Sequence, residues 1–333
     1  MPDKKVSIES QLMDLDNLQE KIEKGEYLIV AGDEALLKKL PSGNWIGGSI
    51  PYFMDNDGGL VSQDKLFVHT IRGCDHARIS PYDVGSISRI NEDAADNGFT
   101  IIILPAGSEV HAHYAQNSPA FPNMFFSPII GWVAGVHLDD VDKQTPKIGF
   151  GPAGMLMENS AVAMHVPLPE HQFANIHTIN LFEQGKGPAI KFPNTGFNVD
   201  TCTLGGKQQD FAQYLLVNKI DTRLPLVADY NGTNVNVSIQ KIDTDGVKFY
   251  GSVFSNVSYQ FASPISDYVT RFNQAISDIQ SDQSAYSCNC ILNFLYGELE
   301  GKKTGSFTGP MVFGEVAYQL LNQTLVFMTL ENQ

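Results

Sequence analysis

The sequence lacks the long apolar runs that would indicate a membrane protein or a leader peptide. No stretch of roughly 18 apolar residues occurs in the chain, so the sequence predicts no transmembrane helix. The first residues, MPDKKVSIESQLMDLDNL, contain no apolar segment typical of a signal peptide. The four cysteines are too few and too scattered for a disulfide framework. We therefore expect a cytoplasmic protein.

Basic residues are also scarce. The chain has 22 Lys and Arg against 37 Asp and Glu, which gives a formal net charge of −15. Binding to a phosphate backbone requires clustered Lys and Arg side chains, and an anionic membrane surface attracts the same side chains. Nucleic acid and membrane are therefore not expected as partners.

The signatures of common enzymes and metal sites are missing as well. The chain has no nucleophile elbow, phosphate loop, dinucleotide-binding fingerprint or zinc-protease motif. His111 and His113 would point apart on a helix, and Cys288 and Cys290 have no second cysteine pair to complete a metal site. We predict that the protein is not an enzyme and that its side chains form no metal-binding site.

The chain does contain one pattern of glycine-spaced, polar and apolar segments that occurs three times. Residues 305–331 hold a glycine-spaced segment ending at Gly314, a polar stretch, and then the apolar run LVFM, typical of a buried strand. Residues 46–71 repeat this order, with QDKLFVHTI parallel to NQTLVFMTL, and residues 130–166 form a looser copy. Such self-similarity predicts a recurring strand–loop–strand unit, with the last strand of the chain buried inside a sheet.

Helical and strand patterns alternate along the chain and hairpin signals occur among them, which predicts an α/β fold with mixed α+β sheets. A length of 333 residues and an apolar content of 43% suit two domains. The Pro-Leu-Pro sequence at residues 167–169 suggests modules at 1–168 and 169–333. The patterns predict helices over residues 7–24, 81–97 and 108–116, the second starting at a Ser-Pro signal and the third capped by Ser108. They predict strands over residues 99–104 and 287–295, the first of them buried on both faces.

Several segments resemble the FIST sensory-domain family, in which an N-terminal and a C-terminal module are paired. Family members have a Cys-containing strand, a G-F-x-x-Y-G-E-I segment and an H-N-Q-T turn, and this chain has YSC, MVFGEV and LNQTL in that order. The sequence IGGS stands where members have an I-G-C-S-T-x-G-E-I loop, GWVAG resembles a second glycine loop, and residues 177–187 resemble the linker. The family's His is Leu321 here, and the first loop keeps neither its Cys nor its Gly-Glu.

This resemblance implies a divergent, stand-alone sensor built from two related modules. Family members are intracellular sensors of small ligands that are coupled to kinase or cyclic-nucleotide output domains, and some are haem proteins that sense nitric oxide. The resemblance therefore implies a non-catalytic small-ligand-binding protein that acts through a separate signalling protein, with homo-oligomerisation left open. The alternatives are a haem-binding gas sensor, an enzyme with a Glu/His pocket, and an assembly protein that has lost the ligand site.

The strongest ligand-binding candidates lie in the last unit: Gly314, Glu315, Tyr318, Asn322 and Gln323. A glycine allows close approach of the backbone to a ligand, and a carboxylate with two amides could fix an amine or an amino-acid-like group. The structural alternative is that Glu315 ties down a neighbouring loop and that the two amides cap a turn, because buried polar groups find protein partners.

A second group of candidates follows the second glycine loop. Trp132 and His137, with the carboxylates at residues 139 and 140, are predicted to form a pocket wall, and Ser49 of the first glycine loop is a further ligand-binding candidate. Neutral imidazole is the usual proximal ligand of haem, so His137 is the best candidate for a haem ligand. A hydrogen-bonded loop histidine is the structural alternative. Ligand and cofactor remain unassigned at this stage.

Overall fold

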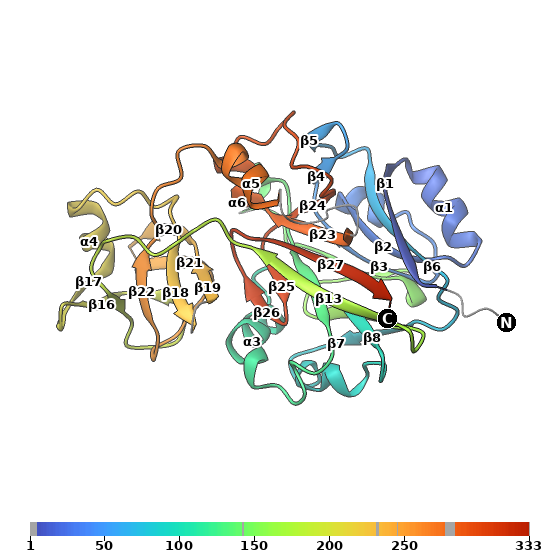
Figure 1. The fold of residues 1–333 in the computed structure, drawn as a ribbon, viewed down its shortest axis with the longest axis horizontal. Helices are drawn as coiled ribbons and strands as arrows, with labels where there is room; N and C mark the ends of the chain where they lie inside the picture. Colours follow the sequence, from blue (N-terminus) through green and yellow to red (C-terminus); the bar gives the residue numbers. More distant parts are fainter. Residues whose placement is uncertain (1–4, 142, 231–232, 245, 277–283, 333) are drawn as a thin grey trace.

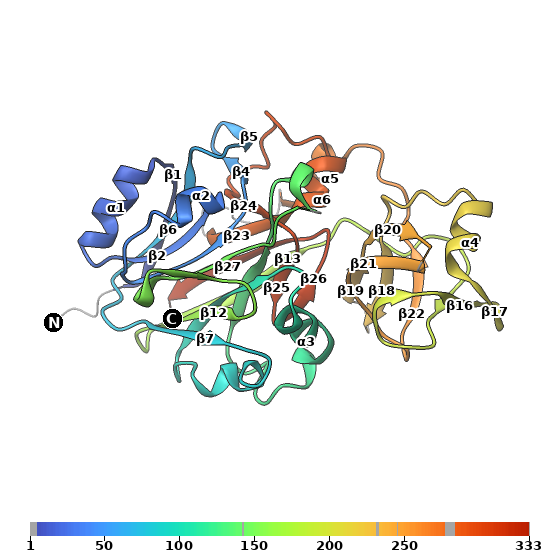
Figure 2. The same ribbon diagram turned by 180° about the vertical axis from the view of Figure 1, so that it is seen from behind.

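The computed structural model describes residues 5–332, apart from residues 142, 231–232, 245 and 277–283 (Figure 1). The chain forms mixed sheets with short helices, which confirms the predicted fold class. Residues 180–262, which we call the insert, form a lobe at the end of the molecule opposite the N-terminal helix α1 (Leu15–Glu23), as Figures 1 and 2 show. Among the helices of the described residues, none has the length and apolar character needed to cross a membrane.

Three consecutive segments share one topology, and we call them unit 1 (residues 7–72), unit 2 (78–167) and unit 3 (172–332). In each unit the last strand is antiparallel to both the first and the second strand, and the second strand pairs in parallel with the third. The four strands are, for unit 1, β1 (Ser7–Met13), β2 (Tyr27–Gly32), β3 (Trp45–Ser49) and β6 (Leu66–Arg72); for unit 2, β7 (Arg78–Tyr82), β8 (Gly98–Pro105), β9 (Ile129–Ala134) and β12 (Ala161–Pro167); and for unit 3, β13 (Gln172–Ile179), β23 (Ser284–Cys290), β24 (Gly309–Val312) and β27 (Leu325–Asn332).

Each unit also carries a hairpin between its third and last strands, and each hairpin pairs with the third strand of another unit. The hairpin of unit 1 extends the sheet of unit 3, that of unit 2 extends unit 1, and that of unit 3 extends unit 2. The exchange closes the three sheets into a ring and covers an edge that would otherwise be unpaired. The hairpins are β4 (Tyr52–Asp55) with β5 (Gly58–Val61), β10 (Ile148–Phe150) with β11 (Met155–Met157), and β25 (Glu315–Ala317) with β26 (Gln319–Leu321).

The repeats detected in the sequence are the parts of these units that run from the third strand through the hairpin to the last strand. The prediction of a recurring strand–loop–strand unit is therefore confirmed. The expected module boundary near residue 168 coincides with the junction of units 2 and 3. Because hairpin exchange places strands from both sides of this junction in common sheets, the division into two modules stays a prediction.

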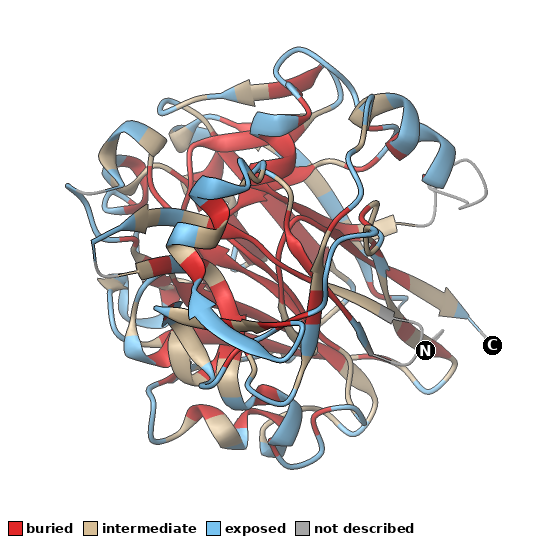
Figure 3. Cartoon of the chain, turned by 90° about the vertical axis from the view of Figure 1, so that its left-hand side faces the viewer, coloured by how far each residue is buried: buried red, intermediate tan, exposed pale blue. Residues whose placement is uncertain are grey.

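Helices connect the second and third strands of every unit, since parallel strands need a crossover. These are α2 (Glu34–Leu37), α3 (Glu109–Asn117) and α6 (Ile291–Tyr296), and α5 (Tyr268–Ile276) precedes β23. The 3-10 helices are η1 (Ile87–Glu92), η2 (Ser118–Ala120), η3 (Leu138–Asp140) and η4 (Gly151–Ala153). Figure 3, viewed from the side of the insert, shows the buried strands in red surrounded by exposed loops in blue.

The last strands of units 1 and 3 use corresponding residues in corresponding ways. Leu66 and Val68 pack in the cluster formed with α1 and α2, whereas Leu325 and Phe327 pack in the cluster formed with α5. Val326, between them, belongs to the core shared by all three sheets. β27 lies between β13 and β23, and residues 326–328 are at most 2% exposed, which confirms the prediction of a buried internal strand.

Three predicted elements were wrong. The helix expected over residues 7–24 starts only at Leu15, because Ile8 and Leu12 fit the strand period of β1 as well as the helical period. The helix expected over residues 81–97 is replaced by strand β7 and the short helix η1, since pairing of β7 with β12 overrides the local Ser-Pro signal. The strand expected over residues 287–295 ends at Cys290, where α6 begins.

Two other local predictions are confirmed. Ser108 caps α3, because its side chain accepts a hydrogen bond from the backbone N–H of His111 at 3.2 Å. Strand β8 is buried on both faces, with residues 99–105 all buried.

The insert has its own hydrophobic core, separate from that of the three units. Phe192, Phe211 and Phe249 lie at its centre and contact one another edge to face or at a tilt. Its elements are β14 (Ile190–Lys191), β15 (Gly196–Val199), β16 (Thr201–Leu204), β17 (Lys207–Asp210), α4 (Phe211–Val217), β18 (Leu226–Tyr230), β19 (Thr233–Val237), β20 (Ile239–Asp243), β21 (Gly246–Val253) and β22 (Ser258–Phe261). A second core predicts that the insert can move as a body relative to the units.

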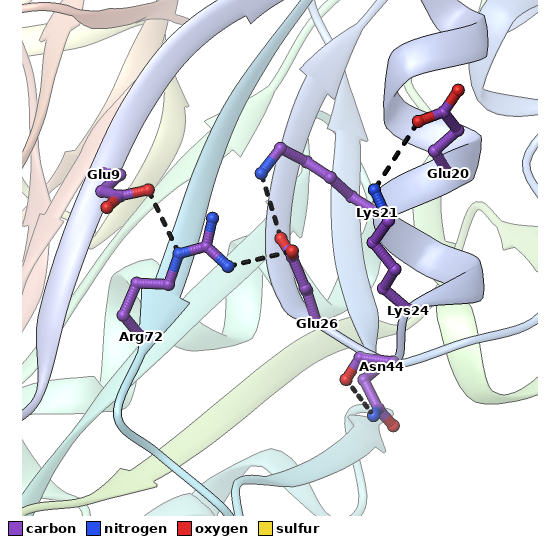
Figure 4. A network of polar contacts seen from close by, with 8 residues as sticks. Glu9, Glu20, Lys21, Lys24, Glu26, Asn44 and Arg72 are labelled. Atoms are coloured by element: carbon purple, nitrogen blue, oxygen red, sulfur yellow. Dashed lines mark hydrogen bonds and ion pairs between the residues drawn. The ribbon is translucent and has the colours of Figure 1, made fainter. Parts of the chain in front are cut away.

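A network of charged side chains holds α1 beside the sheet of unit 1 (Figure 4). Arg72 of β6 contacts Glu26 at 2.9 Å and Glu9 at 3.1 Å, and Lys21 of α1 contacts Glu26 at 3.0 Å. Burial of Glu26 opposes its ionisation, but the hydrogen bonds from Lys21 and Arg72 outweigh this effect and lower the pKa of the carboxyl group. Such partly exposed pairs orient a helix more than they stabilise the fold.

Candidate functional site

The candidate residues of the last unit do come together, but they are enclosed in protein. Glu315 begins β25 and pairs with Trp132 of β9, and its side chain is fully buried. One carboxyl oxygen, Oε2, accepts hydrogen bonds from the backbone N–H and the hydroxyl of Thr324 at 3.1 and 2.7 Å. Burial raises the pKa of Glu315 to about 8, and the Thr324 hydrogen bonds and the Cys290 thiol only partly offset this effect. The group is therefore mostly neutral near pH 7.

The two amides beside Glu315 bind protein groups. Gln323 accepts a hydrogen bond from the Ser238 hydroxyl at 2.7 Å and donates one to the carbonyl of Arg223 at 3.3 Å. The side-chain amide of Asn322 donates a hydrogen bond to the carbonyl of Leu321 at 3.0 Å, and the backbone carbonyl of Asn322 accepts one from the side chain of Asn236 at 3.1 Å. A cavity that Asn322 lines has a volume of about 20 Å³, which is room for little more than one water molecule. These residues join the insert to unit 3, and we call residues 315 and 322–324 with their partners the polar joint.

Gly314 and Tyr318 also make structural contacts, which hold the hairpin of β25 and β26 in place. The carbonyl of Gly314 accepts a hydrogen bond from the N–H of Val133 at 2.8 Å. Tyr318 occupies the one-residue turn between β25 and β26 with φ of +62°, and its carbonyl accepts from the hydroxyl of Tyr114 at 2.8 Å. Both residues hold the exchanged hairpin of unit 3 against unit 2.

The candidates near the second glycine loop lie in separate places. Trp132 is fully buried in the shared core. Ser49 bridges two loops, since its hydroxyl donates to the carbonyl of Gly135 at 2.7 Å and accepts from the N–H of Lys147 at 2.8 Å. His137 caps η3 by accepting from the N–H of Asp139 at 3.3 Å. Its ring stacks on Tyr52 with centroids 5.6 Å apart.

A larger cavity lies elsewhere, between the N-terminus of α3 and the insert, and we call it the α3 cavity. Its volume is about 380 Å³, which falls within the usual range for small-ligand sites. It is open at the carboxyl ends of the parallel strands β8 and β9, where α/β sheets commonly bind ligands. The lining residues are Ala106, Gly107, Ser108, His111, Ala112, Gln116, Phe197, Asn198, Gln240, Lys248, Phe249, Tyr250 and Phe313.

The charge of the α3 cavity differs from that of the rest of the protein. Lys248 is the one charged side chain in the described lining, and no Asp or Glu lines the cavity. In the part of the chain that the structure describes, Lys248 forms no ion pair. Lys248 is exposed, and other exposed lysines such as Lys39 and Lys191 also form no ion pair among the described residues. The described lining of the cavity therefore carries one positive and no negative side chain.

His111 lines this cavity and is itself almost fully buried. It is 5% exposed, and its ring lies beside that of Phe197 with centroids 5.4 Å apart. Burial lowers the pKa of His111 to about 4, so the ring is neutral near pH 7. Nδ1 accepts from the N–H of Gly107 at 3.3 Å, which places the proton on Nε2. Nε2 has no hydrogen-bond partner among the described residues.

The start of α3 supplies further positive potential. Gly107 has φ of +76°, a conformation that favours glycine, and this turn brings Ser108 to the N-cap. The first turn of a helix carries backbone N–H groups without intrahelical partners and the positive end of the helix dipole. Glu109 in this first turn offsets part of that potential, and Lys248 supplies the positive charge that makes this end of the cavity suited to an anion.

Sequence reasoning did not find this site, although it noted the histidine pair at its edge. His111 was considered as a metal ligand together with His113, but the two rings pack apart, against Phe197 and Phe121. Among the described residues, no group of three or more His, Cys, Asp and Glu side chains could hold a metal ion. The remaining wall comes from the insert, more than 80 residues further along the chain, and no spacing in the sequence links it to α3.

Comparison with known proteins gives a family but no activity. The chain belongs to the family of unknown function DUF6976, whose model matches residues 13–331. No curated protein and no solved structure matches the chain. The resemblance to FIST sensors stays a prediction from the motifs.

Proposed function

We propose that this protein is a non-catalytic, cytoplasmic small-ligand-binding protein of the sensory type, that its ligand occupies the α3 cavity, and that it acts through a separate signalling protein. The observation that carries the proposal is the cavity itself. About 380 Å³ is bordered by apolar rings, by the exposed Lys248, and by His111, whose buried Nε2 has no hydrogen-bond partner in the described chain. Sites of this kind combine apolar walls with a few placed polar groups.

The position of the cavity supports a sensory role. One wall is α3 of unit 2, and the other is formed by β15, β20 and β21 of the insert, which has its own hydrophobic core. A ligand that contacts both walls stabilises the arrangement in which they lie together. This differential affinity is the physical requirement for a ligand to shift a conformational equilibrium. The insert is thus the element that would report occupancy to a partner protein.

The chemistry of the lining favours binding over catalysis. The titratable side chains of the cavity are Lys248, His111 and Tyr250. Burial raises the pKa of Tyr250 to about 12, so its phenol stays neutral, and Nδ1 of His111 is already bonded to Gly107. Among the residues that the structure describes, no carboxylate lines the cavity to act with them as an acid–base pair. The enzyme alternative, which used Glu315 and a histidine, has no support from the enclosed position of Glu315.

The haem alternative remains separate from this cavity. His137 stacks on Tyr52 and caps η3, and it does not line the α3 cavity. A visible absorption spectrum of the purified protein tests this alternative directly, because a Soret band would establish haem. We expect a colourless protein.

The main experiment identifies what the cavity holds. Native mass spectrometry of the purified protein gives the mass of any retained ligand, and thermal melts with small-molecule extracts detect binding by an empty cavity. Ala112→Trp should fill the cavity and abolish the retained mass or the thermal shift. Ala35→Trp, at an exposed alanine of α2 outside the lining, is the matched control and should behave as wild type. A folded Ala112→Trp variant that binds normally would contradict the proposed location.

A further inference from the structure

We infer that the ligand of the α3 cavity is a small aromatic monocarboxylate. This inference rests on the proposed function, because it assigns a chemical class to the same site. Its first step is the sign of the charge. A protein with 37 acidic and 22 basic residues has kept every acidic side chain out of this lining and has placed Lys248 in it. A cationic ligand would find no counter-charge here, whereas an anion would.

The second step is the amount of charge. Lys248 supplies one formal positive charge and His111 is neutral, because burial lowers its pKa to about 4. The N-terminus of α3 adds a partial charge of roughly half a unit, which the exposed Glu109 in its first turn partly offsets. This total balances a monoanion. Sites for phosphate dianions typically recruit several cationic side chains or a metal ion, and the described lining has a single lysine.

The third step is the shape of the remaining wall. Four aromatic side chains line the cavity beside the polar end: Phe197, Phe249, Tyr250 and Phe313. Phe313 is held in place where Gly135 leaves room for it, since a Cβ at residue 135 would lie 2.3 Å from the Phe313 ring. Rings of this kind pack against flat apolar groups with a gain beyond the area that they bury. The carboxylate would face Lys248, His111 and α3, and the ring would lie among the aromatic side chains.

The amide side chains complete the recognition. Asn198, Gln240 and Gln116 line the cavity and can donate and accept hydrogen bonds without adding charge. They allow a ring substituent such as a hydroxyl or an indole N–H to be bound. The lining thus discriminates by charge at one end and by hydrogen bonding around the ring.

Isothermal titration calorimetry with named probes tests this assignment. The probes are benzoate, phenylacetate and indole-3-acetate, each compared with its neutral amide and with phenyl phosphate, at pH 7 and low salt. We expect at least one carboxylate to bind about tenfold or more tightly than its amide, since a hydrogen bond to a charged group is the stronger interaction. Lys248→Gln should remove this preference and leave amide binding unchanged. Lys191→Gln, at an exposed lysine of the insert outside the lining, is the matched control and should keep it.

The outcomes separate this inference from the proposed function. The anionic assignment would be overturned if the amides bind as tightly as the carboxylates, or if the preference for carboxylates survives Lys248→Gln. In either case the cavity would still be the ligand site if Ala112→Trp blocks binding. Phenyl phosphate that binds more tightly than every carboxylate would replace the monoanion by a phosphate ester. Absence of binding by all probes to wild type would reject the aromatic carboxylate class, and the retained ligand seen by native mass spectrometry would still decide the proposed function.

Discussion

The polar joint and the α3 cavity both lie where the insert meets the three units, yet their polar groups are used in opposite ways. In the joint, Gln323, the backbone of Asn322 and Oε2 of Glu315 are bonded to protein groups, Oε1 of Glu315 is buried without a hydrogen-bond partner in the described chain, and the space beside them holds about 20 Å³. In the cavity, the exposed Lys248 forms no ion pair and the buried Nε2 of His111 has no hydrogen-bond partner in the described chain, beside about 380 Å³ of space. Residue type alone therefore does not mark a ligand site. A polar atom without a protein partner marks a candidate ligand site where an open volume lies beside it, as at the α3 cavity.

The largest expected effect concerns the strand on which the joint rests. Phe327→Ala should lower the free energy of unfolding by about 3–5 kcal/mol, the usual range for a buried phenylalanine. Phe327 is 2% exposed and packs against Phe307 and His177, with ring centroids 4.9 and 4.6 Å away. Urea denaturation measures the change. A loss below about 1 kcal/mol would show that β27 is not part of the core.

The next effect concerns the pH dependence of stability. Because burial raises the pKa of Glu315 from 4.5 to about 8, the folded state binds its proton more tightly than the unfolded state. The stability that this proton contributes is fully present below pH 4.5, is lost as the pH rises to about 8, and changes no further above that. The slope in this window is at most about 1.4 kcal/mol per pH unit for one group.

Glu315→Gln should remove this slope, because an amide keeps an acceptor for Thr324 and has no proton to lose in this range. Denaturation series at several pH values between 5 and 9 compare the variant with wild type. Parallel profiles would show that Glu315 does not govern the pH dependence. The same variant should bind the cavity ligand with unchanged affinity, which sharpens the distinction between the joint and the cavity.

The smallest effect on stability is expected at the cavity. Phe197 is partly exposed and lines the α3 cavity, so Phe197→Ala should change the free energy of unfolding by about 1 kcal/mol or less. It should nevertheless weaken ligand binding, because its ring forms part of the ligand wall. Calorimetry and denaturation on the same preparation give both quantities. A large stability loss with unchanged affinity would reverse the roles assigned to the two regions.

The sequence by itself determined the repeated design and much of the local structure. Glycine-spaced segments followed by apolar runs marked the third strand and the last strand of each unit, because buried strands need continuous apolar residues. The cap at Ser108 was also readable, since capping depends on neighbouring residues alone. Elements such as β1, whose few apolar residues fit two periods, could not be assigned until their pairing partners were known.

The tertiary structure decided how the units combine and where the site lies. Each hairpin could have paired with its own unit, and only the assembled molecule shows that it pairs with the preceding unit around the ring. The tertiary structure also decided the role of Glu315. Its carboxyl group is fully buried and accepts hydrogen bonds from Thr324, so it belongs to the joint. The α3 cavity joins His111 to Lys248 across 137 positions of the chain. Such a meeting depends on how the insert packs against unit 2, which no local pattern encodes.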